Sequence, residues 1–281
     1  MDGSDLQSKA EALSGASETL LIPLACRARG SRDRVLKSFN DPVAEQLVET
    51  LRVDLDRYAI SREMLLSVIY RGDFFDRCCL DFLSHHPDGT VLNLGAGLNT
   101  SYERIRDGSP EGGWRWVDTD LAPVIGLREG LFEDDDRRTT VALDASNIEA
   151  IQNRLDSITG PVLVVSEAVL IYVQPDAVAN VFKAVAQRGN AEFVFDWVSP
   201  MMMRNSRNHP AIKKLRDESV VFTSSLKRAS DIRNYDLRWR VKAESSAPMT
   251  KSSLGGAIAA FFFSLFTFGR RAYGCAHAHL V

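Results

Sequence analysis

The stretch of sequence that decides the fold is Val91-Leu92-Asn93-Leu94-Gly95-Ala96-Gly97-Leu98-Asn99-Thr100. Its apolar first half predicts a buried strand at residues 90–94, and a helical pattern follows from about residue 102. Gly95 and Gly97 therefore fall in a turn between a strand and a helix. In open α/β sheets ligands bind beside such turns, because glycine lets the backbone approach the ligand closely.

The residue that ends this stretch argues against a dinucleotide ligand. The phosphate-binding fingerprint of nucleotide dehydrogenases has a third glycine at the position that Thr100 occupies here. Without that glycine, a cofactor that carries an amino acid on a ribose and has no phosphates is preferred. A Gly-x-Gly turn that serves only the fold is the alternative to either ligand.

Outside the turn, short apolar runs alternate with helical stretches. Strands are expected at residues 90–94, 115–119, 139–143, 161–166, 192–196, 235–242 and 272–281. Helices are expected near residues 102–106, 123–132, 146–155 and 175–187, and at 253–268 before the last strand. This order predicts an α/β fold with a seven-stranded, mostly parallel sheet, helices on both faces, and an antiparallel hairpin of the last two strands at one edge.

The two ends of the chain are expected to frame this sheet. Residues 1–89 read as a helical cap, with one helix opening at Asp41-Pro42, a second carrying Met64 to Ile69 and a third carrying Phe74 to Leu83. Residues 90–281 read as the ligand-binding α/β domain. Regularity lapses after residue 196, so residues 199–251 are expected to form a lid-like insertion.

Acidic residues follow three of the expected strands. Asp120 comes 25 residues after Gly95, where a carboxylate can accept both ribose hydroxyls of a nucleoside. Asp144 follows the third strand and can reach the adenine amino group, and Glu167 follows the fourth and can hold the amino group of the cofactor. Helix capping by the two aspartates and a solvent-facing Glu167 are the structural alternatives.

Four of these segments, taken in order and spacing, carry a family resemblance: VLNLGAGLNT (91–100), WVDTDLAPVI (116–125), ALDAS (142–146) and SEAVLIYV (166–173). Together they resemble the leucine carboxyl methyltransferase family. The segments ETLLIPLACRA (18–28) and FNDPVA (39–44) look like its branch of tetracenomycin-type polyketide and small-molecule O-methyltransferases. The resemblance implies a class I methyltransferase of Rossmann-like fold that uses S-adenosylmethionine.

The resemblance also implies the cofactor site residue by residue. Gly95 matches the first glycine of the family's turn, and Arg71 falls where the family has an arginine that can pair with the methionyl carboxylate. Arg27 is a second candidate for that carboxylate or for an acidic substrate, with a solvated surface arginine as its alternative. The cofactor-binding residues expected are Arg71, Asn93, Gly95, Ala96, Gly97, Asp120, Leu121, Asp144, Ala145, Glu167 and Ala168.

The chain departs from the family's pattern at three points. Asn99 stands where the family has Asp, Thr100-Ser101 replaces a Thr-Arg pair, and Ala168 replaces a glycine that often follows the strand-exit Glu. These departures leave the cofactor site in place and put any borrowed substrate preference in doubt.

The methyl acceptor is expected to be a carboxylate or a hydroxyl of a small, polyketide-like secondary metabolite. A carboxylate needs no general base, whereas a hydroxyl profits from one, and His209 and Tyr172 are the candidate catalytic residues. Asp196 and Met202 are candidate substrate-binding residues, and Met202 with the phenylalanine-rich residues 261–268 is a candidate lining for an apolar acceptor pocket. Core packing, and a surface role for a lone histidine, are the alternatives.

Composition limits the classes of ligand and partner that the chain is expected to bind. The formal net charge of −3 and the pI of about 6.0 do not favour nucleic acid. The four cysteines lack metal-ligand spacing, so no metal is expected and the thiols are expected to be buried. The most apolar stretch, residues 254–268, is too short to span a membrane, and no signal peptide is recognisable, which favours a cytoplasmic protein. A homodimer is left open.

Three other functions are weighed against methyl transfer to a small molecule. An NAD(P)-dependent oxidoreductase shares the strand-turn-helix logic, but Thr100 and the lack of a Tyr-x-x-x-Lys pair after the fourth strand disfavour it. A non-catalytic binding scaffold is disfavoured by the full set of acids at the strand exits. A protein C-terminal carboxyl methyltransferase ranks lower because the N-terminal segment resembles the small-molecule branch.

Overall fold

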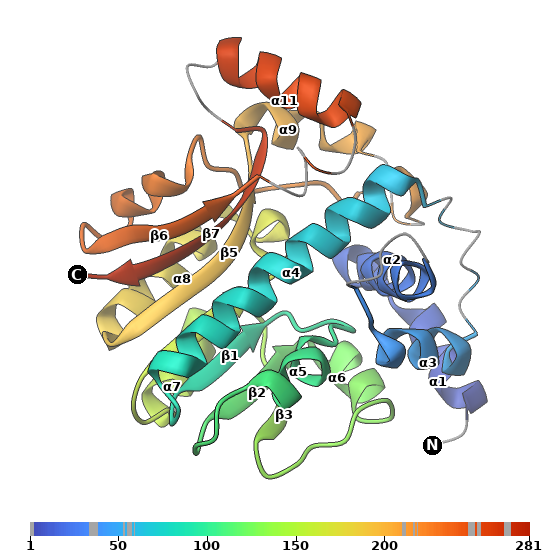
Figure 1. Cartoon of the computed structure of the whole chain (residues 1–281), viewed down its shortest axis with the longest axis horizontal. Coiled ribbons are helices and arrows are strands. Elements are labelled where there is room, and N and C mark those ends of the chain that lie inside the picture. The colour runs from blue at the N-terminus through green and yellow to red at the C-terminus, as the bar shows by residue number, and fades with distance from the viewer. Residues whose placement is uncertain are drawn as a thin grey trace.

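The structure is a computed structural model of the chain. It describes residues 3–33, 39–52, 54, 58, 60–209, 212–215, 217, 219–246, 251, 254–266 and 271–281. A central twisted sheet runs through the molecule, and helices cover both of its faces (Figure 1). None of the helices in these ranges is both long and apolar enough to cross a membrane.

Seven strands form the sheet in the order β3-β2-β1-β4-β5-β7-β6. The first five are parallel, and β7 runs antiparallel to both β5 and β6. This arrangement confirms the predicted mostly parallel sheet with an antiparallel hairpin at one edge. The strands are β1 (Thr90–Leu94), β2 (Arg115–Asp120), β3 (Arg138–Ala142), β4 (Val162–Ser166), β5 (Ala191–Val198), β6 (Trp239–Ser245) and β7 (Tyr273–Leu280).

Helices connect these strands and fill the N-terminal third of the chain. The α-helices are α1 (Gly3–Ala12), α2 (Leu21–Arg32), α3 (Pro42–Thr50), α4 (Arg62–His85), α5 (Ser101–Ile105), α6 (Ala122–Arg128), α7 (Ile148–Ser157), α8 (Pro175–Arg188), α9 (Pro200–Arg204) and α11 (Leu254–Phe266). The 3-10 turns are η1 (Gly15–Leu20), η2 (Arg106–Gly108), η3 (Leu170–Tyr172), η4 (Ser206–Asn208), η5 (Ile212–Lys214) and η6 (Ala229–Asn234).

Alternating side chains of each strand build two cores. On one face, Leu92, Val164 and Phe193 pack with the apolar sides of α7 and α8. On the other face, Val91 and Leu163 pack with the second half of α4 and with α5. Strands that are buried on both faces in this way read as continuous apolar runs, which is why β1 and β4 are recognisable in the sequence.

The strand order reverses between β1 and β4. The chain leaves β1 toward β2 and β3 on one side, and later returns to place β4 on the other side of β1. Ligands of open α/β sheets bind in the crevice outside the carboxyl ends of the strands at such a switch point. The glycine turn follows β1 and Glu167 follows β4, so both flank this crevice.

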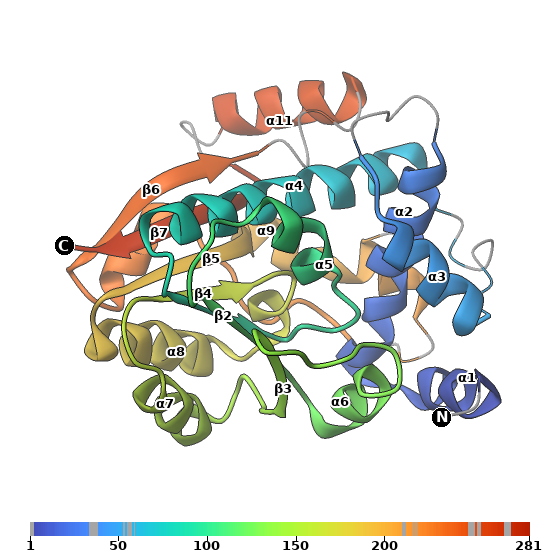
Figure 2. The ribbon, with the colours of Figure 1, turned by 60° about the horizontal axis from the view of Figure 1, so that its bottom comes forward.

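The N-terminal region differs from its prediction in one element. The two helices expected around residues 64–69 and 74–83 are a single helix, α4, of 24 residues. Ser61 caps its N-terminus by accepting a hydrogen bond from the Met64 amide at 3.2 Å. Figure 2 shows α4 lying across the sheet, with α2 beside its first half and α3 packed against α2. A boundary of a separate cap at residue 89 stays a prediction.

The expected lid region, residues 199–251, holds α9, three 3-10 turns and β6. β6 begins at Trp239, four residues later than the expected strand at 235–242. The helix expected at 253–268 is α11, and residues 253, 267 and 268 lie outside the described ranges. The same holds for the side chains of Phe262 and Phe263, so a pocket-lining role for the phenylalanine-rich stretch stays a prediction.

Candidate functional site

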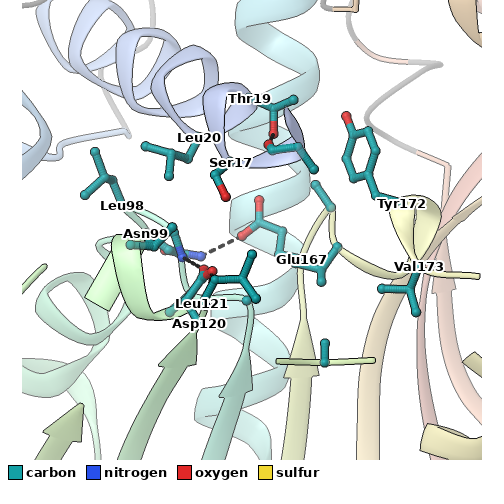
Figure 3. Close-up of a pocket in the computed structure, with 18 of the residues that line it drawn as sticks. Ser17, Thr19, Leu20, Leu98, Asn99, Asp120, Leu121, Glu167, Tyr172 and Val173 are labelled. Atoms are coloured by element: carbon teal, nitrogen blue, oxygen red, sulfur yellow. Dashed lines mark hydrogen bonds between the residues drawn. The ribbon is translucent and has the colours of Figure 1, made fainter. Parts of the chain in front are cut away.

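A cavity of about 330 Å³ opens at the carboxyl edge of the sheet, at the switch point between β1 and β4. Its floor is the glycine turn, and its walls come from the segments that follow β2, β3 and β4. The segment from η1 to α2 covers it from the opposite side (Figure 3). Of the eleven cofactor residues expected from sequence, all except Asn93 line this cavity.

The glycine turn has a backbone that other residues would not accept. Gly95 has φ +73°, and a Cβ there would lie 2.3 Å from a methyl carbon of Val169. Gly97 has φ +51°. The amides of Gly95 and Ala96 both donate to the Thr119 carbonyl at 2.8 Å, which ties the turn to the end of β2. The turn is thus held rigidly with its backbone facing the cavity.

A buried ion pair supports the turn from beneath. Asp118 and Arg128 are 2% and 1% exposed, and their side chains form a salt bridge at 2.5 Å. Arg128 also donates to the Gly97 carbonyl at 2.7 Å. Asn93, expected as a cofactor residue, is buried beside this pair and donates to Asp118 at 2.8 Å. Sequence reasoning missed Arg128, because an arginine on a short helix carries no signal of burial.

Asp120 stands at the mouth of the turn, where β2 ends. Its carboxylate accepts hydrogen bonds from the amides of Gly97 and Leu121, each at 2.7 Å. Burial raises the pKa of Asp120, although these two amides act in the opposite direction. A carboxylate has about four acceptor sites, so two remain for a ligand's hydroxyls. Leu121 beside it is 42% exposed although it is apolar, and it borders the cavity.

Glu167 lies at the centre of the cavity and is bonded through both oxygens. Arg71 donates from Nε to Oε1 at 2.7 Å. Asn99 donates to Oε2 at 2.8 Å (Figure 3). Burial alone would raise the pKa of Glu167, but Arg71, Arg27 and Arg104 together hold it below its usual value. Glu167 is therefore an anion, and Asn99, where the family has Asp, adds a neutral donor instead of a second negative charge.

Arg71 reaches the cavity from α4 with much of its guanidinium uncommitted. Burial opposes its charge, but Tyr273, Glu167 and Asp196 raise the pKa of Arg71 well above its ordinary value. Within the described residues, the only hydrogen bond of its side chain is the one that Nε gives to Glu167. Its terminal nitrogens are thus available for a carboxylate, which a planar guanidinium can bind through two bonds.

Arg27 lines the cavity from α2 and is 4% exposed. Its Nη2 donates to the Leu98 carbonyl at 2.6 Å, and its buried Nε has no hydrogen-bond partner in the described part of the chain. Asp41 lies 3.5 Å from that Nε and accepts hydrogen bonds from Thr100 at 2.6 Å and Arg104 at 3.0 Å. The solvated-surface alternative for Arg27 is therefore wrong.

Asp144 and Ala145 line the outer end of the cavity. Asp144 is exposed, and its Oδ1 accepts hydrogen bonds from the amide and hydroxyl of Ser146 at 2.8 and 2.7 Å. The helix α7 starts later and is capped by Asn147 instead. The structural alternative for Asp144, capping of that helix, is therefore wrong, and its second oxygen stays available to a ligand.

Ala168 follows Glu167 in a strained conformation with φ +57°. Its amide donates to Asp196 Oδ1 at 2.8 Å, and the Tyr273 hydroxyl donates to Asp196 Oδ2 at 2.7 Å. Asp196 is 1% exposed, and burial raises its pKa. Asp196, expected to bind substrate, thus has both oxygens committed to positioning the Glu167–Ala168 segment, and it does not line the cofactor cavity.

The two candidate catalytic residues lie on one chain of aromatic contacts. Tyr172 lines the cavity, and burial raises its pKa to about 12. Its ring packs edge-on against Phe222 at 5.4 Å, and the His209 ring lies 5.4 Å from the same Phe222. Burial, and then the charge of Arg71, lower the pKa of His209 below its ordinary value of 6.5. His209 is therefore a neutral imidazole, and it is not among the residues that line the cavity.

The cover of the cavity comes from residues that sequence reasoning missed. Ser17, Thr19 and Leu20 of η1 face Glu167 and Asp120 across the cavity (Figure 3). No periodicity or charge marks them in the sequence, and only the family-like segment 18–28 pointed to this region. Met202, expected to bind substrate, is half-buried, packs against the α4 side of the sheet and does not line the cavity.

The cavity fits a nucleoside that carries an amino acid. One continuous space is lined by three charged side chains. Asp120 can bind a ribose diol, the Arg71 guanidinium can bind a carboxylate, and Glu167 can bind an ammonium group. No cluster of three or more His, Cys, Asp or Glu side chains that could hold a metal ion occurs in the described ranges. All four cysteines are buried free thiols. The donor set matches S-adenosylmethionine, which has no phosphates to place.

Comparisons with known proteins agree with this geometry. Residues 21–186, more than half of the chain, match the leucine carboxyl methyltransferase family. The chain is 28% identical over 195 residues to the tetracenomycin polyketide synthesis O-methyltransferase TcmP of Streptomyces glaucescens, covering 68% of this chain and 69% of that protein. It is 33% identical over 145 residues to the S-adenosyl-L-methionine-dependent methyltransferase dpfgK of Gibberella zeae, covering 48% of this chain and 47% of that protein.

A solved structure of a candidate methyltransferase from Thermobifida fusca has the same fold. The TM-score is 0.55 at 16% sequence identity, over 86% of this chain and 90% of that chain. That likeness concerns the fold alone, whereas the family match spans residues 21–186, which include the glycine turn, Asp120, Asp144 and Glu167. The chain therefore belongs to the leucine carboxyl methyltransferase family and is an S-adenosylmethionine-dependent methyltransferase.

Proposed function

We propose that this methyltransferase transfers the methyl group to an oxygen of a small-molecule acceptor. The observation that carries the proposal is that Tyr172 lines the cavity, while the neutral His209 packs on Phe222, the ring that Tyr172 contacts. The relation to a protein named as a polyketide O-methyltransferase supports it. The acceptor would be a hydroxyl or carboxylate of a secondary metabolite.

Each polar group of the cavity has one task in holding the cofactor. We assign the ribose hydroxyls to Asp120, the adenine edge to Asp144 and Leu121, the amino group to Glu167 and the carboxylate to Arg71, with Arg27 as a second cation. Bound S-adenosylmethionine supplies a methyl group on a positively charged sulfur. These residues would hold the cofactor by its amino acid and by its ribose. Binding at these two points would orient the methyl-bearing group for transfer.

The protein's part in the transfer is to align the acceptor oxygen and to exclude water. The η1 segment covers the cavity, and Tyr172 forms part of its wall. A hydroxyl acceptor must lose its proton as the oxygen–carbon bond forms and the carbon–sulfur bond breaks. A neutral imidazole can take that proton, and the lowered pKa of His209 keeps it neutral.

Methyl transfer with labelled S-adenosylmethionine tests the proposal. We would offer three acceptors, namely 2-naphthol, 2-naphthoic acid and a peptide that ends in leucine. The proposal expects the label on one of the first two, as an aryl ether or an ester. Label on the peptide alone would contradict it in favour of a protein carboxyl methyltransferase.

A further inference from the structure

A second cavity of about 270 Å³ lies on the other side of the η3 turn. Residues 169 and 172–174 border the cofactor cavity, whereas Leu170, Ile171 and Pro175 border the second one. Its other walls come from α8, from the end of β5 and from the segment 223–226. None of the tasks assigned to the cofactor cavity accounts for this space.

The walls of the second cavity are aromatic. Phe182, Phe195, Trp197 and Tyr235 all line it. Phe182 stacks with Tyr235 at 5.3 Å and meets Phe195 edge-on at 5.0 Å, so the rings hold each other in place. Rigid aromatic walls of this kind suit a flat, apolar ligand.

Two hydroxyls that line this cavity, those of Thr223 and Ser224, have already used their protons. Thr223 Oγ1 donates to the Val173 carbonyl at 2.8 Å, and Ser224 Oγ donates to the same carbonyl at 2.5 Å. A hydroxyl has one proton and two lone pairs, so both groups can only accept a further hydrogen bond. A ligand that bonds to either of these two hydroxyls must therefore donate.

Charge gives a further restriction. The side chains that line the second cavity include no Lys, Arg or His among the described residues. The one acid, Asp196, has its oxygens bonded to the Ala168 amide and the Tyr273 hydroxyl. A carboxylate ligand would lose its hydration here without gaining a cation, so the cavity favours an uncharged ligand.

We propose that this second cavity binds a neutral hydroxyarene, a flat aromatic ring whose O–H group donates to Thr223 or Ser224. The inference goes beyond the proposed function, because the η3 turn separates the two cavities. The Ile171 carbonyl accepts hydrogen bonds from the amides of Thr223 and Ser224 at 2.8 and 3.3 Å, which ties segment 223–224 to this turn. The ligand is the methyl acceptor itself or a separate effector.

Three matched probes test the proposal by calorimetry on the whole protein, with S-adenosylhomocysteine saturating the cofactor cavity. They are 2-naphthol, 2-methoxynaphthalene, which lacks the donor, and 2-naphthoate, which carries a charge. We expect 2-naphthol to bind at least about tenfold more tightly than either analogue, the size of one lost hydrogen bond. Equal binding of 2-naphthol and 2-naphthoate, or no binding of 2-naphthol, would overturn the proposal.

Two substitutions test whether 2-naphthol binds in this cavity. Ser225→Phe and Leu226→Phe each add a ring to the lining and should abolish 2-naphthol binding. Lys227→Phe adds the same ring to the exposed neighbour that does not line the cavity, and should leave binding unchanged. All three variants should bind S-adenosylhomocysteine as the parent does, which shows that they fold. Undiminished 2-naphthol binding by both filled variants would contradict the assignment.

Mass spectrometry after addition of S-adenosylmethionine shows whether the ligand is the methyl acceptor or a separate effector. Methylation of 2-naphthol that is lost in Ser225→Phe and Leu226→Phe would identify the cavity's ligand as the acceptor. Bound but unmethylated 2-naphthol, or methylation that both filled variants keep, would identify an effector site, and either result supports the hydroxyarene site. Failure of the proposed function appears separately, as a lack of oxygen methylation with every acceptor tested.

Discussion

Glu167 and Arg71 illustrate how single residues are tuned at this site. Removing a carboxylate from water disfavours its charge, yet three arginines keep the pKa of Glu167 below its usual value. The pair is held at 2.7 Å with a neutral amide, Asn99, on the other oxygen. The site is thus charged before any ligand arrives, and no proton need move when a zwitterionic amino acid binds.

Ala168 gives a prediction about stability. Its φ of +57° is unfavourable for a residue with a Cβ, and the Asp196 carboxylate holds it there. Ala168→Gly should raise the free energy of unfolding by about 1 kcal/mol, measured by urea denaturation. As a control, Ala184→Gly in the helix α8 should lower it by a similar amount. A loss of stability in both variants would contradict the strained conformation.

His209 gives a prediction about pH. Burial and the charge of Arg71 lower the pKa of His209 below 6.5, so it is neutral above that pH and protonated at sufficiently low pH. A proton acceptor must be neutral, so methyl transfer to a hydroxyl should rise as pH rises through this lowered pKa and then level off. His209→Gln should remove the rise. The same pH profile in both proteins would contradict the base role.

At the scale of elements, β2, α6 and the glycine turn behave as one unit. Asp118 on β2 is paired with Arg128 at the end of α6, and Arg128 holds the carbonyl of Gly97. A buried charge without its partner is costly, because it has lost its hydration. The cofactor turn is therefore supported by a network that lies outside the lining of the cavity.

This unit predicts the effect of breaking the pair. Asp118→Asn should lower the free energy of unfolding by about 3 kcal/mol, because Arg128 stays buried without a counter-charge. The double variant Asp118→Leu with Arg128→Met should lose less than the single one, since both charges are removed. Denaturation in urea measures these variants and the two matching single ones, Asp118→Leu and Arg128→Met. A double variant that loses the sum of those two single changes would contradict the coupling.

Individual strands and helices also show how much of the fold can be predicted from the sequence. The strands β1, β4 and β5 are apolar runs of the expected length, and the sequence predicts each of them to within a few residues. The sequence divides the helix α4 in two, because Arg71 and Asp73 interrupt its apolar pattern. Arg71 is drawn inward by Glu167, a contact across 96 residues of sequence that local periodicity does not register.

For the whole molecule, the strand order explains which site residues are predictable. Residues at the carboxyl ends of parallel strands must meet at one edge, so Gly95, Asp120, Asp144 and Glu167 can be grouped from the sequence alone. The residues of η1 cannot, because nothing local places them over the cavity. Arg128 and the second cavity escape prediction for the same reason, since both depend on contacts between distant segments.

The central claim is that separate residues of the cavity bind the ribose and the amino acid of S-adenosylmethionine. Two related ligands test it. Calorimetry would compare S-adenosylhomocysteine with methylthioadenosine, which lacks the amino acid. Glu167→Gln should weaken S-adenosylhomocysteine at least about tenfold and leave methylthioadenosine unchanged, whereas Asp120→Asn should weaken both. No binding of S-adenosylhomocysteine to the folded parent protein, or equal loss of both ligands in Glu167→Gln, would contradict the account.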